Sequence, residues 1–176
     1  MRTHKIVLWV LISVLIVSCG KKEKEESEAE KATYPILTGW LTADSIFNHL
    51  PEMKTEKEEY QPDSAAIAYL KQFNQNVNVL VMLGTWCSDS RREVPRFLKV
   101  MEETGNDRFH YELFGLDRSK RDSLGLGEKN QIEYVPTFII FQDSGEIGRI
   151  VETPQISIEQ DLVDILTDIE QKKEAL

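Results

Sequence analysis

An apolar run that passes directly into an amphipathic helical segment constrains the fold of this chain most strongly. Residues 77–83 read Val-Asn-Val-Leu-Val-Met-Leu and end at Gly84, a pattern typical of a short strand buried on both faces of a sheet. A helix is predicted from Cys87 to about Glu103, because its apolar residues share one helical face: Val94, Phe97, Leu98 and Met101. A buried strand followed by such a helix predicts an α/β protein.

The rest of the chain supplies the elements of a single α/β domain. Residues 138–141 and 147–151 predict a hairpin, since a turn signal around Gly145 separates them. The other predicted segments, in chain order, are a helix that starts at Thr42, a polar loop at 51–62, a helix from Asp63 or Ser64 to Phe73, a strand at 109–116, a loop with a short helix at 118–131, and a helix that starts at Ser157. This order predicts a mixed sheet with helices on both faces.

The first residues have the pattern of an export signal. A short basic head precedes a run of about 12 mostly apolar residues, which is typical of a secretory signal and too short for a helix that spans a bilayer. The run ends at Ile16-Val17-Ser18-Cys19-Gly20, which resembles the lipobox of bacterial lipoproteins. The resemblance implies that residues 1–18 are removed and that Cys19 carries a lipid. The alternative is an ordinary signal peptide, or an uncleaved anchor, with an incidental cysteine.

Lipidation of Cys19 implies attachment to the cell envelope of a Gram-negative bacterium. The residue after Cys19 is Gly20 and not the aspartate associated with inner-membrane retention, which favours the outer membrane, on its periplasmic face or at the cell surface. Residues 20–33 contain no large apolar side chain, so we expect residues 19–33 to form a solvated tether; a short charged helix is the alternative. Residues 34–60 are an extension without an assigned role, and residues 61–176 form the main domain.

The charge of the chain argues against some partners. The formal net charge is −9, and removal of the signal would take away two basic residues and leave the mature chain more acidic. An acidic protein is a poor candidate for nucleic acid or anionic lipid headgroups. Attachment to a membrane is therefore expected to come from the lipid on Cys19 alone.

Two short motifs together resemble the active-site signatures of the thioredoxin family. The first is Gly84-Thr85-Trp86-Cys87-Ser88-Asp89-Ser90-Arg91, and the second, about fifty residues later, is Tyr134-Val135-Pro136-Thr137-Phe138. In that family the pattern Trp-Cys-x-x-Cys opens a helix and a cis-proline opens a later strand. The resemblance covers roughly residues 60–172. It implies that Val135 presents its main chain to a partner, that Pro136 is cis and lies beside Cys87, and that Thr137 matches the usual threonine.

The resemblance breaks at the second cysteine, where this chain has Ser90. With Cys19 lipidated, Cys87 has no partner for a disulfide within the mature chain. Helix-terminal N–H groups favour its thiolate, Ser90 could donate a hydrogen bond to the sulfur, and Trp86 provides an apolar wall. The carboxylate of Asp89 opposes a neighbouring thiolate, and Arg91 and Arg92 could offset it.

Two functional hypotheses stay open at this point. In the first, Cys87 attacks a substrate disulfide, a sulfenic acid or a low-molecular-weight disulfide, and an external thiol or a second substrate cysteine then releases the mixed disulfide. In the second, the domain is a redox-inactive binding module of the cell envelope, and Cys87 is a small buried side chain. Val81 stands where many thioredoxins carry a buried acid, which argues against a general disulfide reductase. The sequence predicts no cofactor, and His49 and His110 lie in different segments and provide no metal-ligand spacing.

Overall fold

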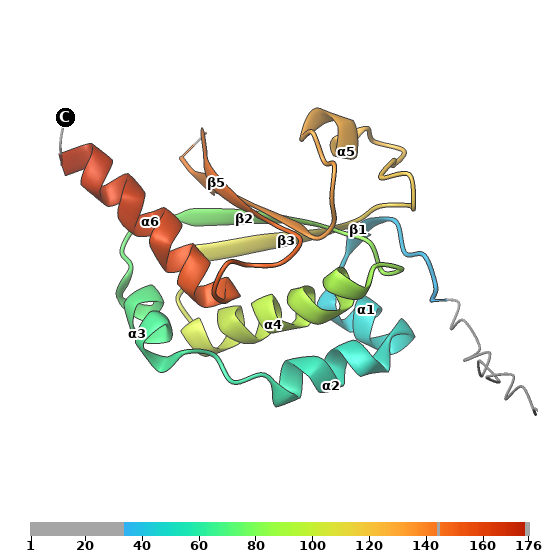
Figure 1. Ribbon diagram of the computed structural model, residues 1–176, viewed down its shortest axis with the longest axis horizontal. Helices are drawn as coiled ribbons and strands as arrows, with labels where there is room; N and C mark the ends of the chain where they lie inside the picture. The colour runs from blue at the N-terminus through green and yellow to red at the C-terminus, as the bar shows by residue number, and fades with distance from the viewer. Residues whose placement is uncertain (1–33, 144, 175–176) are drawn as a thin grey trace, which may run out of the picture. The chain divides into compact units, whose positions relative to one another are not determined.

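The computed structural model describes residues 34–143 and 145–174. A five-stranded mixed sheet of order β1-β3-β2-β4-β5 lies at its centre (Figure 1). The strands are β1 (Gly39–Leu41), β2 (Val77–Leu83), β3 (Phe109–Gly115), β4 (Thr137–Gln142) and β5 (Gly145–Val151). β2 runs parallel to β3, and every other neighbouring pair is antiparallel. The expected α/β class and the mixed sheet are confirmed.

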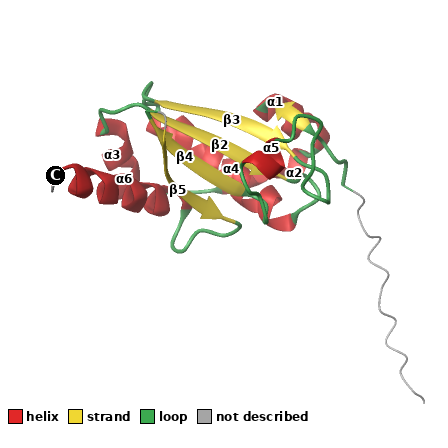
Figure 2. Cartoon of the chain, turned by 90° about the horizontal axis from the view of Figure 1, so that it is seen from above, coloured by secondary structure: helices red, strands yellow, loops and turns green. Residues whose placement is uncertain are grey.

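Helices cover the two faces of the sheet unequally. They are α1 (Ala43–His49), α2 (Pro51–Glu59), α3 (Ser64–Gln72), α4 (Ser88–Thr104), α5 (Leu126–Lys129) and α6 (Ile158–Glu174). The five longer helices lie on one face, and the short α5 lies on the other (Figures 1 and 2). The segment that connects β3 to β4 contains α5, so a loop and one helical turn cover the second face.

The central strand β2 is buried on both faces, as its sequence predicted. Val79 and Val81 point into the large core formed with α3, α4 and α6, whereas Met82 belongs to a smaller cluster on the opposite face. In the large core, the rings of Phe97 and Phe138 are completely buried, with centroids 5.3 Å apart. Burial of one such ring contributes about 2–3 kcal/mol, which fixes α4 against the strand that carries the second motif.

Residues 34–60 pack against the rest of the domain. β1 continues the sheet beyond β3, with Leu41 opposite Leu113. Thr42 caps α1 as expected, and Ser45 completes a reciprocal capping box with it. Trp40, which is half-exposed, packs edge-on against the ring of Phe114 at a centroid distance of 4.8 Å. The extension therefore adds an edge strand and two helices to the sheet.

The prediction of a loop at residues 51–62 was wrong, because residues 51–59 form α2. Pro51 occupies the first turn, where its missing N–H removes no helical hydrogen bond. The Glu and Lys residues that made the segment look like a loop are good helix formers. The segment has only one completely buried apolar side chain, Met53, and ion pairs from Glu56 to Arg96 and from Lys57 to Glu102 attach it to α4.

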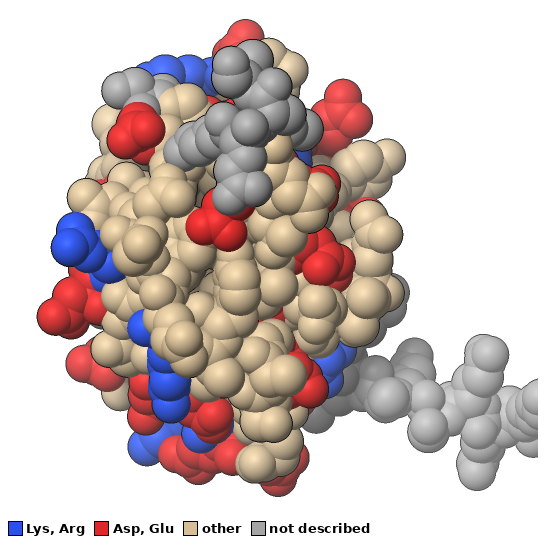
Figure 3. Space-filling view, turned by 90° about the vertical axis from the view of Figure 1, so that its left-hand side faces the viewer, with Lys and Arg blue, Asp and Glu red and all other residues tan. Residues whose placement is uncertain are grey.

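The N-terminal predictions are not tested by the structure, and the surface charge is mixed. The proposed signal, Cys19 and the tether at 19–33 all lie outside the described residues. Among the helices that the structure describes, none has the length and apolar character needed to cross a membrane. On the face shown in Figure 3, acidic and basic side chains are interspersed among uncharged ones.

Candidate active site

Cys87 lies at the start of α4, as the sequence predicted. It is the N-cap residue, with extended backbone angles (φ −89°, ψ 131°), and its side chain is half-buried. Its main-chain N–H donates to the carbonyl of Gly84 over 2.8 Å, and its own carbonyl accepts the first helical hydrogen bond, from Arg91. The sulfur therefore lies at a helix end where the first N–H groups have no partner within the helix.

The second motif meets this cysteine. The Val135–Pro136 peptide bond is cis, as the family resemblance implied. The thiol of Cys87 donates to the carbonyl oxygen of Val135, with 3.1 Å between sulfur and oxygen, although the residues are 48 positions apart. Thr137 is buried and its hydroxyl donates to the carbonyl of Tyr134. The fold thus brings Cys87 and the strand that opens at Pro136 into direct contact.

Ser90 does not contact the sulfur in the way the sequence suggested. Its side chain is completely buried, and its hydroxyl oxygen accepts a hydrogen bond from the main-chain N–H of Gly84 over 3.1 Å. The expected donation to Cys87 is not formed between these two described residues. Because Ser90 is the third residue of α4, its side chain turns back to the loop that precedes the helix, and it fixes the end of β2 to the first turn of α4.

Trp86 forms one wall of the site. Its indole N–H donates to the carbonyl oxygen of Leu116 over 3.0 Å, and the partly buried ring packs with Cys87 against the smaller apolar cluster. The guanidinium carbon of Arg118 lies 5.4 Å from the ring centroid, a cation–π contact. Contacts on both sides therefore fix the orientation of the indole beside the thiol.

The charged residues around Cys87 have different roles. One carboxylate oxygen of Asp89 lies 4.0 Å from the sulfur, and the other is paired with Arg92 over 2.8 Å. Arg91 instead donates to the carbonyl of Thr85 and lies over the ring of Tyr34, 3.5 Å from its centroid. Of the two arginines that the sequence offered as partners for Asp89, only Arg92 takes that place.

Sequence reasoning missed Thr85, which joins the site loop to the N-terminal extension. Its side chain is completely buried, and its hydroxyl donates to the carbonyl of Pro35 and accepts from the N–H of Leu37. These partners are about 50 residues away in sequence, so no local pattern could have revealed them. The extension thereby supports the loop that presents Trp86 and Cys87.

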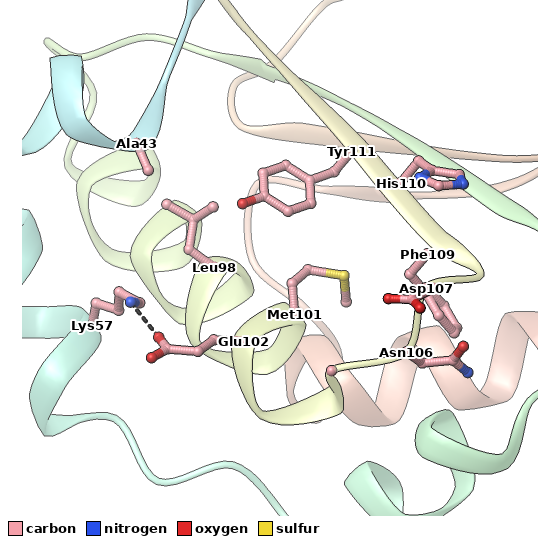
Figure 4. A pocket seen from close by; sticks show the side chains of 11 residues that line it. Ala43, Lys57, Leu98, Met101, Glu102, Asn106, Asp107, Phe109, His110 and Tyr111 are labelled. Atoms are coloured by element: carbon pink, nitrogen blue, oxygen red, sulfur yellow. Dashed lines mark ion pairs between the residues drawn. The ribbon is translucent and has the colours of Figure 1, made fainter.

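A groove lies far from this site. It is a groove of about 650 Å³ at the C-terminal end of α4, lined among others by Lys57, Leu98, Met101, Glu102 and Tyr111 (Figure 4). The 17 residues of α4 span about 25 Å, and Cys87 lies at the other end. Within the described parts of the chain, no group of three or more His, Cys, Asp or Glu side chains could hold a metal ion.

The fold resembles solved structures at low sequence identity. A protein of unknown function from Pseudomonas aeruginosa shares 15% identity at a TM-score of 0.53, over 75% of this chain and 99% of its own. An HIV epitope scaffold shares 18% identity at a TM-score of 0.57, over 76% of this chain and 93% of its own. Thioredoxin-2 of the malaria parasite shares 21% identity at a TM-score of 0.42, over 55% of this chain and 86% of its own.

The family assignment comes from the sequence. No curated protein matches the chain. The sequence profile of a family described as Thioredoxin matches residues 46–167, a range that includes both Trp86-Cys87 and the cis-proline segment. The five-stranded mixed sheet and the contact between Cys87 and Val135 agree with that match. The chain therefore belongs to the thioredoxin family.

Proposed function

We propose that this protein is a monothiol thiol–disulfide exchange protein of the bacterial cell envelope. The observation that carries the proposal is the position of the Cys87 sulfur, half-buried at a helix end and 3.1 Å from the Val135 carbonyl. Ser90, completely buried behind it, cannot act as a resolving thiol. A thiol in this position can attack a disulfide, but it needs a second thiol from outside the domain to be released.

The exchange has two balanced steps. The Cys87 thiol loses its proton to water, and the thiolate attacks one sulfur of a client disulfide. That S–S bond breaks, a new one forms to Cys87, and the departing sulfur takes the electron pair and then a proton. An external thiolate, or the thiolate of a second client cysteine, then attacks the client sulfur of the mixed disulfide. A new S–S bond forms on the client, the bond to Cys87 breaks, and Cys87 takes the electron pair and then a proton. Rearrangement of client disulfides needs no further cysteine in the protein.

Main-chain groups beside Cys87 suit a polypeptide client. The Val135 carbonyl accepts the thiol proton in the free protein, and it loses that donor when the thiolate forms. It is then able to accept an N–H from an extended client segment. The partly buried ring of Trp86 adds apolar surface beside Cys87, and the ring of Tyr134, which precedes Val135 in the chain, is half-exposed. Protein clients are therefore favoured, with low-molecular-weight disulfides as alternatives of the same chemistry.

The test is the capture of a mixed disulfide in cells. Cells that produce the protein are quenched with acid and alkylated, and Cys87 adducts are identified by mass spectrometry. We expect a reducible adduct with an envelope protein or a small thiol, absent from Cys87→Ala. If the original protein carries no adduct on Cys87, and Cys87→Ala keeps the same protein partners by affinity capture, the exchange proposal fails and the domain acts as a binding module.

The lipid anchor is a separate part of the proposal. Its support is the sequence Ile16-Val17-Ser18-Cys19-Gly20 after a short apolar run. A lipid on Cys19 would place the domain on a membrane, in the outer membrane if Gly20 allows export from the inner one. We expect Cys19→Ala to move the protein from the membrane fraction to the soluble fraction. If Cys19→Ala stays in the membrane fraction, attachment does not depend on this cysteine.

A further inference from the structure

A single guanidinium group connects the surroundings of Cys87 to the interior of the domain. Arg92, in the second turn of α4, donates to the Asp89 carboxylate over 2.8 Å and to the Glu93 carboxylate over 2.6 Å. It also donates to the hydroxyl of Thr153 over 3.0 Å. Thr153 directly follows Glu152, whose N–H donates to the carbonyl of Pro136. Arg92 thus joins the first turns of α4 to the segment after β5, which is itself hydrogen-bonded to Pro136.

The Glu93 carboxylate gives Arg92 a fixed anchor. Glu93 is almost completely buried, at 1% exposure, and its second carboxylate oxygen has no hydrogen-bond partner among the described residues. A buried carboxylate of this kind strongly favours a cation beside it. The hydrogen bond to Glu93 correspondingly raises the pKa of Arg92. The buried Glu93 carboxylate therefore holds the Arg92 guanidinium in place independently of Asp89.

Asp89 is the group that needs this cation. The Asp89 oxygen that does not pair with Arg92 lies 4.0 Å from the Cys87 sulfur. At that distance an unpaired carboxylate repels a negative charge on the sulfur, and it does so more strongly in a surrounding less polar than water. The other nearby cations have different partners, since Arg91 contacts Thr85 and Tyr34 and Arg118 lies over Trp86.

We propose that Arg92 is a positioning residue that cancels the charge of Asp89 beside Cys87 and so keeps the thiol reactive. The inference rests on the proposed function only because nucleophilic attack by the Cys87 thiolate is the step that Arg92 assists. Arg92 contacts neither the sulfur nor the attacked disulfide. It acts through Asp89, and the anchor on Glu93 and the bond to Thr153 fix its position.

The test is the rate at which iodoacetamide alkylates Cys87 across a pH series in purified protein. We expect Arg92→Gln to slow alkylation at pH 7 by about fivefold and to leave the rate unchanged at high pH, where the thiol is fully ionised. Asp89→Asn in the same chain restores the rate, and Arg92→Lys retains most of it. Arg96→Gln is the matched control, because it removes the same charge one turn further along α4. Arg96 pairs with Glu56 and lies 3.6 Å from Glu93. We expect Arg96→Gln to change the alkylation rate of Cys87 by less than about twofold.

Several outcomes would overturn the proposal. It fails if Arg92→Gln alkylates at the original rate, or if the double variant with Asp89→Asn stays as slow as Arg92→Gln alone. Because Arg92→Gln leaves Glu93 buried without its closest partner, that variant could fail to fold. Arg92→Gln combined with Glu93→Gln removes this problem, and it must show the same fivefold loss while it unfolds at a temperature close to that of the original protein.

This test is independent of the exchange activity. Alkylation measures the thiol itself and needs no client. If the variants alkylate as expected but Cys87 captures nothing in cells, the proposed function fails and the role of Arg92 stands. If Cys87 captures a client and Arg92→Gln alkylates at the original rate, the role of Arg92 fails and the proposed function stands.

Discussion

Replacing Ser90 with cysteine should convert the domain from a monothiol to a dithiol protein. Ser90 is the third residue of α4 and Cys87 is its N-cap, and residues three apart at a helix start are neighbours. The serine side chain is completely buried and accepts one hydrogen bond, from Gly84. In Ser90→Cys the introduced side chain would turn from Gly84 toward Cys87, its neighbour at the helix start, and its thiol could then reach a mixed disulfide on Cys87.

The structure gives two magnitudes for Ser90→Cys. In Ser90→Cys a sulfur replaces the hydroxyl oxygen that accepts the Gly84 N–H, and sulfur is a weaker acceptor. The substitution should lower the free energy of unfolding by about 1 kcal/mol, which corresponds to a decrease of about 3 °C in the unfolding temperature of the reduced protein. A neighbouring thiol acts at an effective concentration well above the millimolar range. We therefore expect it to release a mixed disulfide at least about tenfold faster than an external thiol present at roughly 1 mM.

The assay begins with purified protein that carries one glutathione on Cys87, freed from excess reagent. Intact-mass spectrometry then follows the adduct without reductant. We expect the adduct to persist on the original protein and to disappear from Ser90→Cys, as Cys87 forms an internal disulfide with the introduced thiol. The reasoning about this helix start is refuted if both adducts last equally long, provided that Ser90→Cys unfolds near the expected temperature.

Three further predictions concern packing and burial in the domain. Phe97→Ala should lower the free energy of unfolding by about 3–5 kcal/mol, because the ring is completely buried in the large core; a loss below about 1 kcal/mol in urea unfolding would contradict this packing. Gly84→Ala places a methyl group 2.7 Å from the Trp86 ring. We therefore expect the indole to lose its hydrogen bond to the Leu116 carbonyl and the tryptophan fluorescence to shift. An unchanged fluorescence spectrum would count against the described geometry. Burial and the Glu159 carboxylate raise the pKa of Tyr60, so the folded state keeps a proton that the unfolded chain loses above about pH 10. The free energy of unfolding should therefore fall as the pH rises past about 10, and it should fall less in Tyr60→Phe. Equal dependence of the free energy of unfolding on pH in both proteins would refute this assignment.

The parts of the fold that the sequence predicted well are those with a local signal. The apolar run that forms β2 and the one-sided helix α4 both appear in the sequence as periodic patterns, and both were found at the expected residues. The cis form of Pro136 was predicted because the family resemblance extended to the second motif, and the structure has it. These features depend on neighbouring residues or on motifs that are recognisable by themselves.

The failures have a shared physical reason, because they depend on contacts between distant residues. Helix α2 looked like a loop, since its stability comes from Met53 and from ion pairs with α4 and not from its own apolar face. The direction of the Ser90 hydroxyl and the division of roles between Arg91 and Arg92 depend on where Gly84 and Tyr34 lie. A sequence shows which side chains are present at a helix start, but not which neighbour each one contacts.

The Cys87 thiol is expected to react in the folded protein, and the domain is expected to be unable to release the product by itself. The most direct measurement is intact-mass spectrometry of the reduced native protein after incubation with excess oxidised glutathione. We predict one glutathione per molecule on Cys87, which persists after the excess is removed and is lost when an external thiol is added. If the native protein takes up no glutathione while the unfolded chain does, the folded domain shields Cys87 from exchange and the protein is no exchange protein.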